Sequence, residues 1–225
     1  MNRQFEHAGK RPLWAYIPFL VLSFSMTAAA ATNTGTSPEP GSYCPNTDVL
    51  MVVAEELSAS LDLTMRSRAA LKNKEPATAI RELNFASTAL YLAASRGAAA
   101  RTVLVIDAII QARSGDDYAQ MLAWFPLLHA SLLTLPGDAT ESAAEDLIVG
   151  AEEVMQGDKA GDPVTLLNQA RHMLACDGLD IPIQDAMSAM GALMTQLGQG
   201  NQGKNNTYDV ILDALRNALL FTMGK

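Results

Sequence analysis

The segment RAALKNKEPATAIRELNFASTAL, residues 68–90, contains the pattern that determines the fold. It reads as the end of one helix, a polar turn, and a second helix that opens at Pro76, because proline at a first helical position loses no hydrogen bond. The segment EEVMQGDKAGDPVTLLNQARHML, residues 152–174, has the same order, with Asp162 as the cap and Pro163 as the first helical residue. Both segments predict helical hairpins. Duplication and independent use of the same turn chemistry both explain their similarity.

The composition favours helices throughout. Apolar residues make up 49% of the 225 residues and aromatic residues only 6%, whereas a β-sandwich or barrel would need more β-branched and aromatic side chains. We therefore expect an all-α fold, a bundle of about six to seven amphipathic helices arranged as hairpins over residues 48–225. A short strand pair near 101–106 or 124–128 is the alternative for the middle of the chain, and the segment LDIPIQ, 179–184, is expected to be extended before Pro182.

Residues 1–31 have the order of a secretory signal peptide. A basic start with Arg3, Lys10 and Arg11 leads into an apolar run and ends in small residues. The alternative is an uncleaved membrane anchor, although Pro18 and nearby hydroxyl side chains make the apolar run marginal for a span. Residues 32–47, rich in Thr, Ser, Pro and Gly, predict a flexible leader. These features predict an exported protein without a stable membrane span after the signal is removed.

The charge of the chain is acidic. Its formal net charge is −8, and removal of residues 1–31, which hold three basic residues and one acidic residue, makes it −10. Nucleic acid is therefore not an expected partner, because binding a phosphate backbone needs a basic surface.

Two groups of residues are candidates for a specific role. Cys44 and Cys176 form an even pair in an exported chain, which predicts a disulfide; the alternative is a free thiol at Cys44 and a small buried apolar residue at Cys176. Met187, Met190 and Met194 lie on one face of a predicted helix, as an adaptable partner-binding stripe or as part of the core.

The sequence predicts no catalytic residues, no cofactor and no metal site. His129 and His172 lie on distant segments, and His172 with Cys176, one helical turn away, supplies only two ligands. An enzyme remains the alternative, with its site around Trp124 and His129, where proline, aromatic rings and a histidine meet.

The order of several segments resembles the YfdX family of bacterial exported helical proteins. The segments are ALKNKEPATAIRELNFA, WFPLLHASL, AEEVMQGDKAGDPVTLLNQA, LDIPIQDAMSAMGALMTQ and DVILDALRNAL, within residues 50–222. The chain departs from the family pattern at Asn73, in the turn at 157–163 and in the loop at 198–206. The resemblance implies a periplasmic, oligomer-forming helical protein, linked to stress responses and chaperone-like in some members. The expected partners are protein partners or unfolded clients and a second copy of the chain, and the alternative role is a structural subunit of an envelope assembly.

Overall fold

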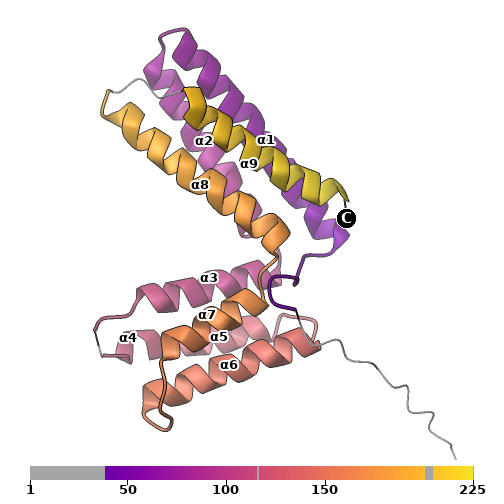
Figure 1. Ribbon diagram of the computed structural model, residues 1–225, viewed down its shortest axis with the longest axis vertical. Helices are drawn as coiled ribbons and strands as arrows, with labels where there is room; N and C mark the ends of the chain where they lie inside the picture. The colour runs from indigo at the N-terminus through magenta and orange to yellow at the C-terminus, as the bar shows by residue number, and fades with distance from the viewer. Residues whose placement is uncertain (1–38, 116, 201–204, 225) are drawn as a thin grey trace, which may run out of the picture. The chain divides into compact units, whose positions relative to one another are not determined.

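The computed structural model describes residues 39–115, 117–200 and 205–224, all of which belong to one compact unit, Thr36–Lys225. This part of the chain is mostly helical, which confirms the all-α class (Figure 1). Its helices are α1 (Thr47–Lys72), α2 (Pro76–Ala94), α3 (Ala98–Gln111), α4 (Ala119–Leu122), α5 (Phe125–Leu132), α6 (Ala139–Gln156), α7 (Pro163–Met173), α8 (Asp177–Gly198) and α9 (Asn205–Gly224). The predicted signal peptide and the first part of the leader, through residue 38, lie outside the described residues.

The first and last helices share one hydrophobic core. α1 packs on α2 and α9, and α8 packs on α2 and α9, so helices from the two ends of the chain lie together. Small side chains allow α1 and α2 to approach closely: Ser60 Oγ donates to the Ala86 carbonyl at 3.0 Å, and Ser67 Oγ donates to the Ala79 carbonyl at 2.8 Å. Ser67 Oγ also lies 2.8 Å from the buried Tyr208 hydroxyl of α9. These bonds satisfy hydroxyl groups that would be costly to bury alone.

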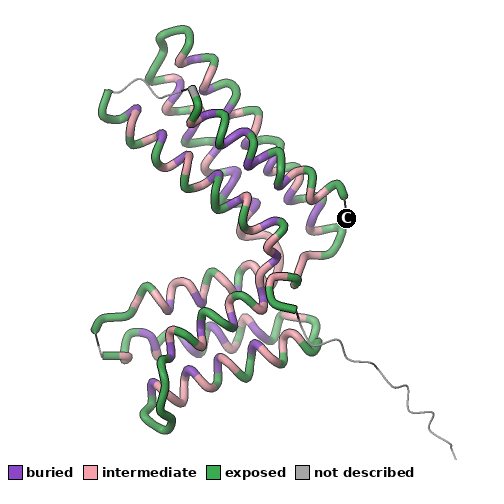
Figure 2. Tube along the Cα trace, viewed as in Figure 1, coloured by how far each residue is buried: buried purple, intermediate pink, exposed green. Residues whose placement is uncertain are grey.

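The intervening helices form a second core. α3 packs on α5 and α7, and α6 packs on α7, around buried side chains that include Ile106, Phe125, Ile148 and Leu167. Buried residues recur along one side of each helix, at the spacing that an amphipathic helix requires (Figure 2). This helical group is inserted between α2 and α8, so the chain enters it after Ala94 and leaves it before Asp177.

Two expectations were wrong, the extended segment at 179–184 and the number of helices, and the strand pair that was the alternative for the middle of the chain is not found among the described residues. Residues 101–106 lie in α3 and residues 125–128 in α5, and the described residues contain only isolated β-bridges, without the strand pair. Residues 179–184 lie in α8, although Pro182 supplies no N–H to the Gly178 carbonyl. Burial of Leu179, Ile183 and Ala186 on one face of α8 outweighs this lost bond. The described residues form nine helices, one of only four residues, where six to seven were expected.

The end of the leader, expected to be flexible, is bonded to the junction of α7 and α8. Gly41 N–H donates to the His172 carbonyl at 2.8 Å, Tyr43 N–H donates to the Ala175 carbonyl at 3.0 Å, and Asp177 N–H donates to the Gly41 carbonyl at 2.8 Å. Cys44 and Cys176 form a disulfide, with their Cα atoms 4.6 Å apart. These bonds hold the end of the leader to the α7–α8 junction on both sides of Ser42, and Ser42 itself forms an isolated β-bridge with Cys176.

Among the described residues, no single helix is both long and apolar enough to cross a membrane. α2 and α3 together satisfy the length and composition of a span, but their axes differ in direction by 107°.

Candidate functional site

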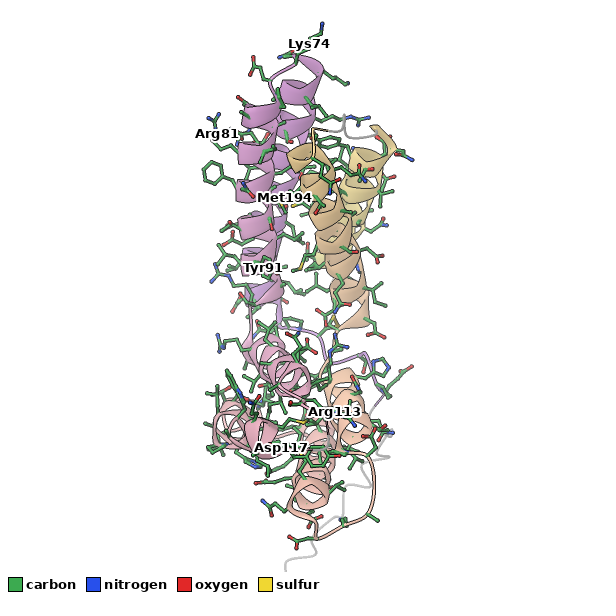
Figure 3. All side chains as sticks on the ribbon, turned by 90° about the vertical axis from the view of Figure 1, so that its left-hand side faces the viewer. Lys74, Arg81, Tyr91, Arg113, Asp117 and Met194 are labelled. Atoms are coloured by element: carbon green, nitrogen blue, oxygen red, sulfur yellow. A yellow bond between two sulfur atoms is a disulfide. The ribbon has the colours of Figure 1, made fainter. Side chains whose placement is uncertain are left out.

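A pocket of about 530 Å³ is lined by side chains of α2, α3, α7 and α8. Its walls are mostly apolar and carry large side chains exposed to solvent: Tyr91 is 60% exposed, Leu104 46% and Ile181 54%. Tyr91, in the last turn of α2, is labelled in Figure 3. Exposed apolar side chains that line one cavity are typical of a binding site, and the volume lies in the range of ligand pockets. We refer to this cavity as the α2/α8 pocket.

Two chain junctions position the walls of the α2/α8 pocket. α2 ends at Ala94, and Gly97, with φ of 92°, turns the chain into α3; this backbone conformation is favourable for glycine alone. After this turn, Leu104 of α3 and Tyr91 of α2 line the same pocket. The α7–α8 junction, to which the leader is bonded, contributes His172 and Asp177.

The polar lining of the pocket is built from ionisable side chains. Arg171 Nε lies 2.7 Å from Asp107 Oδ1, with both side chains one-third exposed. Burial raises the pKa of the Asp107 carboxyl, although the nearby Arg171 guanidinium opposes the shift. Asp107 and Arg171 thus form a partly solvated ion pair in the wall of the pocket.

The start of α8 contributes two further carboxyls. Asp180 Oδ2 accepts from the backbone N–H of Cys176, the N-cap residue of α8, at 2.8 Å. Burial also raises the pKa of Asp180, although the Cys176 N–H opposes the shift. Asp177 Oδ1 lies 3.8 Å from His172 Nδ1, too far for a hydrogen bond. Asp177 is therefore only loosely paired at the edge of the pocket.

The methionine stripe does not form a single binding surface, because α8 buries it against the first core. Met190 is 1% exposed, and Met187 and Met194 are half-buried and pack against the same core. Of the three, only Met187 lines the α2/α8 pocket. The three methionines therefore pack in or against the core, which is one of the two roles that the sequence left open.

His129, in the irregular middle of the chain, and His172, in α7, have different partners. His129 Nε2 lies 2.9 Å from Glu152 Oε2, and its ring is 6.0 Å from the ring of Phe125. Trp124 precedes α5, and none of residues 124–129 lines the α2/α8 pocket. Cys176 is bonded to Cys44, so it offers no thiol to a metal beside His172. Within the described ranges, no group of three or more His, Cys, Asp and Glu side chains is placed to hold a metal ion.

Sequence reasoning missed the lining of the pocket. One signal was present: Asp107 is the single charged residue in the apolar run VLVIDAII, 103–110, where a buried helix has no need of a carboxyl. Its partner Arg171 lies on a different helix, and periodicity within one helix carries no information about that pairing.

Comparison with protein-family models, with curated proteins and with solved structures finds no match to this chain.

Proposed function

We propose that this protein is an exported, periplasmic interaction protein that holds apolar segments of other proteins, with chaperone-like behaviour in envelope stress. The observation that carries this proposal is the α2/α8 pocket, whose apolar walls are open to solvent at Tyr91, Leu104 and Ile181. Soluble proteins rarely leave such side chains gathered without a partner.

Export is supported by two independent features. Residues 1–31 have the composition of a signal peptide, and the Cys44–Cys176 disulfide suits an oxidising compartment. The resemblance to the YfdX family also implies a periplasmic location, and it is the basis for proposing homo-oligomers and a role in stress. We also propose that the helices are arranged as helical hairpins. The packing of α1 on α2, of α6 on α7 and of α8 on α9 supports this arrangement.

A light-scattering assay with an unfolding client protein tests the proposed function. Equimolar protein should suppress aggregation of the client, and Leu104→Ser should lose most of this effect, because it removes an apolar side chain from the pocket wall. Leu127→Ser is the matched control: Leu127 is 50% exposed on α5, carries the same change in helix propensity and does not line the pocket.

Absence of suppression by the unmodified protein would remove the chaperone-like role. Equal loss in both leucine variants would show that the pocket is not the binding surface. If suppression is absent while size-exclusion chromatography shows stable oligomers, the structural subunit becomes the better proposal.

A further inference from the structure

The α2/α8 pocket carries more acidic than basic side chains. Its charged lining consists of Asp107 on α3, Arg171 on α7, and Asp177 and Asp180 on α8, and the lining also contains the imidazole of His172. With His172 neutral, three carboxylates face one guanidinium. Among the described residues that line the pocket, α2 adds only apolar and uncharged polar side chains.

Two of these carboxyls keep acceptor capacity for an incoming group. Asp107 is paired with Arg171 through Oδ1 alone, and no described residue donates to its Oδ2. Among the described residues, the Asp177 side chain makes only the long contact to His172, and it is 42% exposed. Asp180 differs, because its Oδ2 already accepts from the Cys176 N–H.

We infer that the α2/α8 pocket selects apolar segments that carry a basic side chain, with Asp107 and Asp177 receiving the cation while Tyr91, Leu104 and Ile181 contact the apolar residues. A lysine or arginine between apolar residues matches this lining, since its aliphatic stem packs on the wall and its charged end reaches the carboxylates. The formal charge of −8 on the whole chain acts in the same direction, because it attracts a cationic segment.

This inference rests on the proposed function and specifies its substrate class. Three fluorescently labelled amphipathic peptides test it; they share all apolar residues and differ only at one central position, which is Lys, Gln or Glu. Fluorescence anisotropy with the full-length protein should show the Lys peptide binding on the order of tenfold more tightly than the Glu peptide, with the Gln peptide between them.

Two pocket variants and one control identify the groups that recognise the charge. Asp107→Asn and Asp177→Asn should each reduce the preference for Lys over Glu to about threefold and leave the Gln peptide unchanged, since neither variant alters the apolar walls. Asp213→Asn is the control: Asp213 on α9 is also an aspartate paired with an arginine, 2.8 Å from Arg216, and lies outside the pocket. It changes the net charge equally and should leave the preference intact. Unchanged binding of the Gln peptide also shows that the variants remain folded.

The possible failures are distinguishable. Equal binding of all three peptides, lost in Leu104→Ser, would overturn the charge selection and leave the proposed function standing. A preference for Lys that falls equally in Asp107→Asn, Asp177→Asn and Asp213→Asn would show attraction by the net charge alone and overturn the assignment to the pocket. If none of the peptides binds, both the inference and the pocket as a site for apolar segments are refuted.

Discussion

Reduction of the Cys44–Cys176 disulfide should lower the stability of the protein substantially. The bridge joins residues separated by 132 positions, so it removes many conformations from the unfolded chain. The chain-entropy relation for a loop of this size gives about 5 kcal/mol at 25 °C. In a chain of this length, a loss of about 5 kcal/mol lowers the melting temperature by about 10–20 °C.

Thermal unfolding followed by circular dichroism, with and without reductant, measures this effect. The Cys44→Ala variant is the control, because it lacks the bridge while Cys176 remains a small residue buried in the first core. It should melt near the temperature of the reduced protein and should not respond to reductant.

A second measurement confirms the chemical state. Thiol counting under denaturing, non-reducing conditions should find no free thiol in protein taken from the cell envelope. Two free thiols per chain, or a melting temperature of the unmodified protein that reductant leaves unchanged, would refute the reasoning.

Two further substitutions test the leader and the start of α8. Gly41→Ala should destabilise the protein by about 0.5–1 kcal/mol more than Gly137→Ala in urea unfolding, because the exposed Asp177 carboxylate must change its rotamer to make room for the added methyl group. Both glycines have φ of 77°, but an added Cβ would overlap the Asp177 carboxylate at position 41 and would contact nothing within 4 Å at position 137; equal losses would contradict this role of Gly41. Asp180→Asn should gain stability relative to the unmodified protein as the pH rises above 3.8. The raised pKa of Asp180 means that the folded state binds more protons than the unfolded state in that window, so its contribution to stability falls with rising pH. Urea unfolding across this pH range checks it, and a constant difference between the two proteins would contradict the raised pKa.

The sequence by itself determined the helical class and several helix ends, because the physics of these features is local. Asp162 caps α7 by accepting from the Thr165 N–H, and Pro76 and Pro163 begin α2 and α7 as predicted. A first helical residue needs no N–H partner, and a cap bonds within three residues, so both can be read from neighbours in the chain.

Local rules failed where tertiary burial opposed them. Pro182 predicts an extended segment, yet α8 continues through it, because its apolar face is buried in the first core. Residues 103–106 were ambiguous between helix and strand because a short run of apolar residues is compatible with either; they lie in α3.

Only the tertiary structure decided which distant residues meet. Cys44 and Cys176, Arg171 and Asp107, and the four helices that line the α2/α8 pocket are brought together by packing over long separations. The helical periodicity specifies which face of each helix is buried, but it carries no information about which helix covers that face. The disulfide was therefore one of two open alternatives from the sequence, whereas the pocket, which exists only between helices, was not visible in it.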